Sequence, residues 1–258
     1  KSIGAGLYKS VCCAKVDGDL CDLRTPLEKD CKVELLTFDN VDGQKTFWHT
    51  ASHVLAQAVK RLYPNAKCAI GPAVDNGFYY DFDVEKPFSP EDLEKIKAEM
   101  KKIVKSGLEL ERVELSPEEA EKKLEEMNEP YKVELVKEHS DKGEHITFYK
   151  QGEFIDLCAG PHLMSVAPIK AIELTACTGA YWRGDANNAQ LCRVYGVAFP
   201  KASMLEEHLK KLEEAKLRDH NKLGRELEYF TTVDYVGQGL PILLPKGARV
   251  VQLLQRWV

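Results

Sequence analysis

Residues 11–38 alternate short β-rich runs with turn signals, and this pattern predicts a small β element. The runs cover 11–16, 19–23 and 31–38, and Asp17-Gly18 separates the first two. Asp-Gly between two such runs is a strong signal for a two-residue hairpin turn. A segment of this length is too short to bury a core alone.

From residue 46 to residue 63 the apolar positions change to a helical period. One stripe of this predicted helix, which ends before Pro64, carries Trp48, Ala51, Leu55, Ala58, Val59 and Leu62. Residues 77–82 then alternate like a half-buried strand. Ser89-Pro90 and Ser116-Pro117 each open a further helix with a capping residue, a proline and acids; these helices end at Gly107 and near Asn128.

The second half of the chain mixes strand-like runs with a charged helix. The runs cover 131–136, 145–149, 154–157, 172–177 and 191–199. Helices and strands in mixed order predict an α+β domain across about 46–200. Residues 202–227 have Leu205, Leu209 and Leu212 on one side and oppositely charged pairs four apart, which is typical of a connector between domains.

Composition and charge narrow the class of protein. With 258 residues, 44% hydrophobic and 30% charged, the chain is long enough for one or two globular domains. No window approaches the roughly 18 consecutive apolar residues of a membrane helix, so we expect no membrane partner. The formal charge of −5 excludes a global basic field, and any RNA must bind a local patch.

The cysteines and the chain ends give two further expectations. None of the eight cysteines falls three residues from another, so CxxC zinc and redox spacings are absent. We therefore expect reduced thiols and a cytoplasmic protein. The chain does not begin with Met and stops inside an apolar periodic run, 253–258, so we expect a piece of a longer protein.

His49 and His53 lie four residues apart on the first predicted helix and therefore on one face. They share that face with Gln57 and Lys60, away from the apolar stripe, so core packing explains them poorly. Two solvated surface histidines are an equally good interpretation, because HxxxH alone is a weak signal. The HExxH pattern of metalloproteases is absent, since no Glu follows His49.

A second group of candidate residues, Cys158-Ala-Gly-Pro-His162, directly follows the run 154–157. Glycine and proline favour a tight turn that holds a thiol and an imidazole at a strand end. Taken with His49 and His53, one thiol and three imidazoles are able to bind tetrahedral zinc or to line a hydrolytic pocket without metal. The residues alone are compatible with both functions.

These motifs, with IGPAVDNGFYYD at 70–81 between them and GAYWRGD at 179–185 after them, closely resemble the threonyl-tRNA synthetase family. The resemblance implies four regions: 1–40 as the C-terminal part of a TGS-like β-grasp domain, 41–200 as a threonyl/alanyl-type editing domain with an antiparallel sheet and helices, 201–227 as a linker helix, and 228–258 as the truncated start of a class II catalytic domain. Ala159 departs from the pattern, because Arg is frequent after the Cys.

The resemblance implies that this chain carries the editing half of threonine–tRNA ligase. One methyl group is worth only about 1–3 kcal/mol of discrimination, so serine must be removed after attachment. The implied reaction hydrolyses the seryl ester on the acceptor end of threonine tRNA without a cofactor. The sites of the full-length enzyme for ATP, magnesium and zinc, and most of its homodimer interface, would lie beyond Val258, so this chain is not expected to attach threonine to tRNA.

The resemblance also assigns site residues: His49, His53, Lys132, Asp156, Cys158 and His162 in the pocket, and Tyr80 and Arg183 against tRNA. Lys132, in the strand-like run, and His49 are expected to position water and transfer its proton. Asp156 suits the substrate ammonium, and Cys158, His53 and His162 suit a wall that crowds an extra methyl group. Tyr80 is expected to stack on adenine.

A zinc-dependent hydrolase, an RNA-binding module with an idle editing site and a structural zinc domain compete with the metal-free hydrolase. Related alanyl-tRNA editing proteins use a similar set of residues for zinc, so His49, His53, Cys158 and His162 are the ligands if zinc is bound. The threonyl-like flanking stretches favour no metal.

Overall fold

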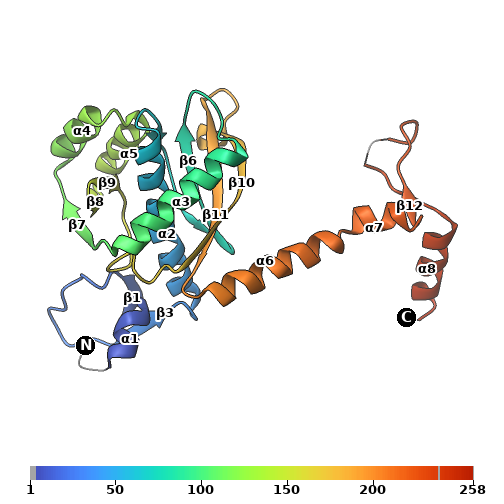
Figure 1. Ribbon diagram of the computed structural model, residues 1–258, viewed down its shortest axis with the longest axis horizontal. Coiled ribbons are helices and arrows are strands. Elements are labelled where there is room, and N and C mark those ends of the chain that lie inside the picture. The colour runs from blue at the N-terminus through green and yellow to red at the C-terminus, as the bar shows by residue number, and fades with distance from the viewer. Residues whose placement is uncertain (1–3, 238, 258) are drawn as a thin grey trace. The chain divides into compact units, whose positions relative to one another are not determined.

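The computed structural model describes residues 4–237 and 239–257, in two compact units (Figure 1). The first unit ends at Leu205 and the second begins at Glu206. Within the described ranges, no helix combines the length and the apolar character that crossing a membrane requires. The first unit mixes helices with antiparallel sheets, which confirms the predicted α+β class.

The first described elements are a short helix, α1 (Ala5–Ser10), and a three-stranded antiparallel sheet in the order β2-β1-β3. The strands are β1 (Val11–Val16), β2 (Asp19–Cys21) and β3 (Val33–Thr37). Asp17 and Gly18 both have positive φ angles, so the predicted hairpin turn is confirmed. The sheet does not stand alone, because its Cys12, Cys13 and Leu36 belong to the main core of the unit.

Helix α2 (Val41–Leu62) begins five residues before the predicted start and is buried along most of its length. The predicted apolar stripe is buried except for Leu62, which is 39% exposed. The opposite face is also covered: His53 and Gln57 are buried, and Gln57 exchanges hydrogen bonds with Gln151 of the second sheet. The interpretation of two surface histidines is therefore wrong, because α2 packs against protein on both sides.

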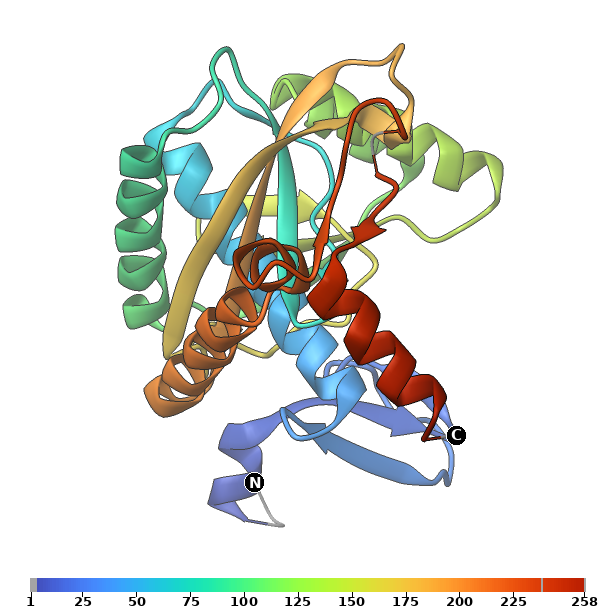
Figure 2. The same ribbon diagram turned by 90° about the vertical axis from the view of Figure 1, so that its right-hand side faces the viewer.

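The main sheet has the antiparallel order β10-β11-β6-β4, with β5 paired to β6. Its strands are β4 (Lys67–Cys68), β5 (Ala73–Val74), β6 (Gly77–Asp83), β10 (Ala171–Tyr181) and β11 (Gln190–Phe199). Figure 2 shows the long β10–β11 hairpin with β6 beside it. The alternation predicted for β6 is confirmed, since Phe78, Tyr80 and Phe82 are all buried.

Helix α3 (Pro90–Ser106) contacts both α2 and β10. The predicted start of this helix is confirmed, because the Ser89 side chain accepts a hydrogen bond from the Asp92 amide in a capping box. The predicted end is confirmed as well, because Gly107 adopts a left-handed conformation with φ 67° after the last helical residue. Helix α4 (Pro117–Glu126) opens with the same kind of capping box at Ser116.

A second antiparallel sheet has the order β7-β8-β9, with strands β7 (Leu110–Glu114), β8 (Thr147–Gln151) and β9 (Phe154–Leu157). Between β7 and β8 lie α4 and α5 (Pro130–Asp141). The strand predicted at 131–136 is wrong, since these residues form the first turns of α5. Two apolar clusters flank this helix, with Tyr131 and Leu135 in one and Val133 and Val136 in the other. Apolar residues on both sides imitate the alternation of a strand.

The second unit contains most of α6 (Ala202–Leu217), followed by α7 (His220–Glu226), β12 (Phe230–Thr231), β13 (Ile242–Leu243) and α8 (Pro245–Gln255). The single helix predicted at 202–227 is interrupted before Asp219, whose side chain caps α7 by accepting hydrogen bonds from the amides of Asn221 and Lys222. Helix α8 begins at Pro245, and the predicted end of its run, Val258, lies outside the described residues.

Candidate functional site

A cavity of about 390 Å³ opens where α2, α5 and the end of β9 meet. This volume lies in the range of small-ligand sites. Five of the six predicted pocket residues line it: His49, His53, Lys132, Asp156 and Cys158. The sixth, His162, lies behind Cys158 with its Nε2 3.2 Å from the Cys158 Sγ. The structure thus brings all six together from three segments that are spread over more than 100 residues of the sequence.

The neutral group, as we name His49, His53, Cys158 and His162, surrounds one thiol. Its four ligand-type atoms all lie within 4.8 Å of one another. Nε2 of His49 and Nε2 of His162 are each 3.2 Å from the Cys158 Sγ. The backbone amide of Gly160 donates a hydrogen bond to this sulfur, at 3.3 Å. The thiol has one proton, so at most one imidazole receives it at a time.

The turn that carries Cys158 is fixed by strand β8. The Cys158 amide donates to the Thr147 carbonyl at 3.0 Å, and the Thr147 hydroxyl donates to the Cys158 carbonyl at 2.6 Å. Gly160 has a φ of 78°, and a Cβ added there would lie 2.3 Å from the Tyr149 hydroxyl oxygen. Only glycine satisfies both the conformation and the close approach.

The ring of His162 is oriented by Thr50, a residue that the sequence did not single out. The Thr50 hydroxyl donates to the Thr46 carbonyl at 3.0 Å and accepts from the Leu163 amide at 2.9 Å. With its proton committed, Thr50 accepts from Nδ1 of His162, 3.2 Å away. We therefore assign the proton of His162 to Nδ1, which leaves Nε2 as an acceptor facing Cys158.

Burial keeps the neutral group uncharged. It lowers the pKa of His49 to about 4 and that of His53 to about 3, and it holds the pKa of His162 well below its usual value. Burial also raises the pKa of the Cys158 thiol to about 12. At neutral pH the site therefore offers three uncharged imidazoles and a protonated thiol rather than a thiolate nucleophile.

The ion-pair group, as we name Lys132, Asp156 and Tyr80, lies against the neutral group. Lys132 Nζ is 2.8 Å from Asp156 Oδ1, and both side chains are about 95% buried or more. The Tyr80 hydroxyl donates to Asp156 Oδ2 at 2.6 Å. Burial alone would lower the pKa of Lys132, but the attraction of the Asp156 carboxylate is larger, so the pKa of Lys132 is raised. Burial alone would raise the pKa of Asp156, but the Lys132 ammonium has the larger effect, so the pKa of Asp156 is lowered. The pair is thus charged at neutral pH.

His53 stands between the two groups. Its Nε2 is 3.6 Å from Asp156 Oδ2, and its Nδ1 is a buried atom with no hydrogen-bond partner among the described residues. A buried polar atom without a partner is costly, so it commonly marks a place for water, a ligand or an ion.

The neutral group also fits a zinc ion by its donor chemistry. Three imidazole nitrogens and one sulfur are a donor set that zinc accepts, at about 2.0–2.3 Å from the metal. Donors within 4.8 Å of one another are compatible with tetrahedral ligation, and the unpartnered His53 Nδ1 adds to this fit. The geometry alone is compatible with both the metal-bound and the metal-free interpretation.

Two predicted tRNA contacts fare differently. The Tyr80 ring is fully buried and stacks on Phe82 at 4.9 Å, so it has no free face for adenine and instead orients Asp156. Arg183 lies over the Trp182 ring and forms ion pairs with Glu134 and Glu138 on α5. Its contact with tRNA stays a prediction.

Comparisons with known proteins agree with the motifs. Residues 146–195 match the family described as "Threonyl and Alanyl tRNA synthetase second additional domain", and residues 1–37 match the TGS domain. The chain is 58% identical to a threonine–tRNA ligase of Clostridium perfringens over 258 residues. These residues are all of this chain and 40% of the relative. The corresponding enzyme of Clostridium botulinum is 55% identical over the same length.

A third relative, the threonine–tRNA ligase of Acetivibrio thermocellus, is 55% identical over 257 residues. The chain spans about 40% of the length of these curated relatives. The matches cover the whole chain, and both matched domains agree with the resemblance seen in the sequence. The chain therefore belongs to the threonyl-tRNA synthetase family and contains its TGS and second additional domains.

Proposed function

We propose that this chain hydrolyses the ester that joins serine to the terminal adenosine of threonine tRNA, as the editing activity of a threonine–tRNA ligase. The observation that carries the proposal is the pairing of uncharged imidazoles with a buried ammonium group in one cavity. Ester hydrolysis needs a proton acceptor for water and a donor for the developing oxyanion. The two groups supply one of each.

His49 takes the role of proton acceptor. It is neutral at pH 7, it is partly exposed within the neutral group, and it lines the cavity. A water oxygen attacks the ester carbonyl carbon while His49 takes a proton from that water. The bond between the carbonyl carbon and the ribose oxygen then breaks, and the ribose oxygen receives the proton from His49. Serine and tRNA are released.

Lys132 takes the role of oxyanion donor. Of its three N–H bonds, one is directed to Asp156 Oδ1 at 2.8 Å and another to the Leu157 carbonyl at 3.5 Å. The third is available to an oxygen in the cavity, which Lys132 lines. As an ammonium held by a carboxylate, Lys132 donates and does not act as a base.

Asp156 acts through Lys132 in this proposal. The sequence suggested that it contacts the substrate ammonium, but its Oδ1 serves Lys132 and its Oδ2 serves Tyr80. We therefore assign it a positioning role. Cys158 and His53, with His162 behind Cys158, form the wall that accepts the hydroxymethyl group of serine and crowds the additional methyl group of threonine.

The proposal does not require a metal. If zinc binds, His49, His53, Cys158 and His162 would hold it, and it would polarise an oxygen of the substrate or of water. For the whole enzyme we propose ATP-dependent attachment of threonine to its tRNA, with magnesium and zinc, in a cytoplasmic homodimer. No described residue is assigned to those steps.

The test is hydrolysis by this chain of Ser-tRNA and Thr-tRNA, both made on threonine tRNA, with and without a zinc chelator. We expect rapid loss of serine, retention of threonine and no effect of the chelator. The His49→Ala variant should lose the activity, and Lys150→Ala, on an exposed position of β8, should keep it.

Two results would contradict the proposal in different ways. Binding of the tRNA without loss of serine would indicate an RNA-binding module with an idle site. Activity that disappears with the chelator and returns with zinc would indicate the zinc-dependent hydrolase of the alanyl type.

A further inference from the structure

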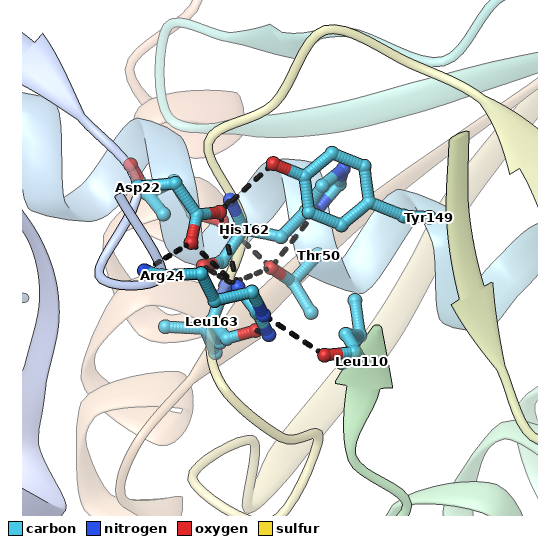
Figure 3. Close-up of polar contacts among 8 residues, drawn as sticks. Asp22, Arg24, Thr50, Leu110, Tyr149, His162 and Leu163 are labelled. Carbon is cyan, nitrogen blue, oxygen red and sulfur yellow. Dashed lines mark hydrogen bonds and ion pairs between the residues drawn. The ribbon is translucent and has the colours of Figure 1, made fainter. Parts of the chain in front are cut away.

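A second polar network surrounds His162, and it includes Asp22 and Arg24 of the N-terminal region (Figure 3). Residues 22–24 follow strand β2, about 140 positions before His162 in the chain. Asp22 Oδ2 accepts hydrogen bonds from the Tyr149 hydroxyl at 2.9 Å and from the His162 amide at 3.2 Å. Asp22 is 8% exposed, so these bonds are made away from solvent.

Arg24 binds the other side of the same backbone. Its Nη2 donates to the Leu163 carbonyl at 2.8 Å and its Nη1 donates to the His162 carbonyl at 3.4 Å. Its Nε donates to the Leu110 carbonyl at 2.9 Å, at the start of β7. Arg24 also pairs with Asp22 at 2.8 Å. The planar guanidinium thus joins three chain segments in a fixed geometry.

The backbone of His162 is therefore held at both polar atoms by side chains of the N-terminal region. Its N–H is bound by Asp22 and its carbonyl by Arg24. The Tyr149 ring, anchored by Asp22, packs edge-on against the His162 ring at 4.4 Å. Thr50 fixes the ring itself through Nδ1. The direction of Nε2 toward Cys158 depends on all of these contacts.

We propose that Asp22 and Arg24 are positioning residues for the hydrolytic site and that they make the TGS-matching region part of the editing machinery. The inference rests on the proposed function. Neither residue lines the cavity, so neither touches the substrate. They act by holding His162, and through it the Cys158 thiol, at the distance that shapes the cavity wall. A shift of about 1 Å in such a wall costs about 100-fold in rate.

The variants Arg24→Gln, Arg24→Lys and Asp22→Asn test this in the full chain. Arg24→Gln removes the charge and the planar guanidinium group. Arg24→Lys keeps the charge, but a single ammonium group cannot bind the Leu163 and Leu110 carbonyls together. Asp22→Asn keeps one acceptor oxygen. The matched controls are Asp19→Asn and Lys29→Gln, which change exposed residues of the same region.

The first readout is the single-turnover rate of serine loss from Ser-tRNA, made on threonine tRNA. We expect a fall of about 10- to 100-fold for Arg24→Gln. A smaller fall is expected for Arg24→Lys and Asp22→Asn, with tRNA affinity unchanged. The controls should keep the wild-type rate. Thermal unfolding is measured beside each assay, so that every rate refers to folded protein.

The second readout does not depend on activity. The ¹⁵N signals of the His162 ring and the exchange rate of the His162 amide report its tautomer and its bond to Asp22. We expect both to change in folded Arg24→Gln and Asp22→Asn and to stay constant in the controls. An inactive wild-type chain would count against the proposed function, while these signals would still decide whether the pair positions His162.

Two results would overturn the inference. Unchanged His162 signals in folded Arg24→Gln would show that the pair does not position the residue. Changed signals with an unchanged rate of serine loss would show that the positioning has no role in the reaction.

Discussion

The neutral group and the ion-pair group lie side by side around one cavity, yet the imidazoles of the first are uncharged whereas Lys132 and Asp156 of the second are charged. Burial leaves His49, His53 and His162 unprotonated, with lowered pKa values. The same burial leaves Lys132 and Asp156 charged, because each finds its counter-charge 2.8 Å away. The difference shows that a close partner, rather than burial alone, decides the charge of a group in this site.

This difference matters for the proposed chemistry. In water, a histidine near its ordinary pKa is partly protonated and a lysine ammonium is diluted among competing donors. Here the imidazoles stay available as acceptors and the ammonium stays available as a donor in the same cavity. A variant that disturbs one group leaves the other group as an internal reference. The largest change in stability is expected for the buried ion pair and the smallest for the removal of metal.

Removing the carboxylate should have the largest effect on stability. Asp156→Asn leaves the Lys132 ammonium buried without its counter-charge, and breaking a buried pair costs about 3–5 kcal/mol in the free energy of unfolding. Urea denaturation measures this. The control is Glu111→Gln, which breaks the exposed pair with Lys150 and should change stability little. Equal losses for the two variants would contradict the charged state assigned to the pair.

Removing one hydroxyl from the ion-pair group should have an intermediate effect. Tyr80→Phe keeps the packed ring and deletes the hydrogen bond to Asp156, which at a charged acceptor is worth about 1.5–3 kcal/mol. The matched variant is Tyr131→Phe, which deletes a similar bond to the more exposed Asp83 and should cost less. The free energies of unfolding of the two variants are measured under the same conditions and compared. A larger loss for Tyr131→Phe than for Tyr80→Phe would argue against a buried charge at Asp156.

Acid should destabilise the protein through the neutral group. The unfolded chain protonates its histidines near pH 6.5, whereas burial holds the pKa of His49 at about 4 and that of His53 at about 3. The contribution of these histidines to the free energy of unfolding is therefore fully present above pH 6.5. It is lost as the pH falls toward 4 and 3, because the unfolded state then binds more protons than the folded state. Each histidine contributes up to about 1.4 kcal/mol per pH unit.

The variants His49→Gln and His53→Gln isolate this effect. Each should flatten the dependence of the free energy of unfolding on pH between about 6.5 and 4. The midpoint of urea denaturation at several pH values is sufficient to measure it. A slope identical to that of the wild type in both variants would mean that these imidazoles do not remain neutral in the folded protein.

Removing metal should have the smallest effect. In the metal-free interpretation, prolonged dialysis against a zinc chelator leaves the melting temperature and the rate of serine loss unchanged. Elemental analysis of the purified protein provides the check. Stoichiometric zinc, together with a lower melting temperature after chelation, would turn the neutral group into a metal centre and erase the contrast between the two groups.

Local signals in the sequence predicted much of the fold. Asp17-Gly18 encodes the hairpin turn by itself, and Ser89-Pro90 and Ser116-Pro117 encode helix starts through contacts within three residues. Five residues that line the cavity, His49, His53, Lys132, Asp156 and Cys158, were named from the resemblance to a known family and not from local pattern. Where the determinant of structure is a neighbour in the chain, pattern is sufficient.

Contacts between residues far apart in the chain could not be predicted from the sequence. Residues 131–136 look like a strand because α5 is covered on two sides, and His49 and His53 look exposed because nothing in their own helix reveals the second sheet. The contacts of Asp22 and Arg24 with His162 join residues about 140 positions apart. No periodicity or motif encodes such a contact.

The most direct test of the proposed chemistry is the single-turnover rate constant for loss of serine from threonine tRNA, compared between the wild-type chain and Lys132→Ala. We predict rapid loss of serine with threonine retained for the wild type. For the variant we predict a fall of about 100- to 1,000-fold, the usual effect of deleting an oxyanion donor. Circular dichroism verifies that the variant is folded. An unchanged rate in folded Lys132→Ala, or equal loss of serine and threonine from the wild type, would contradict this chemistry.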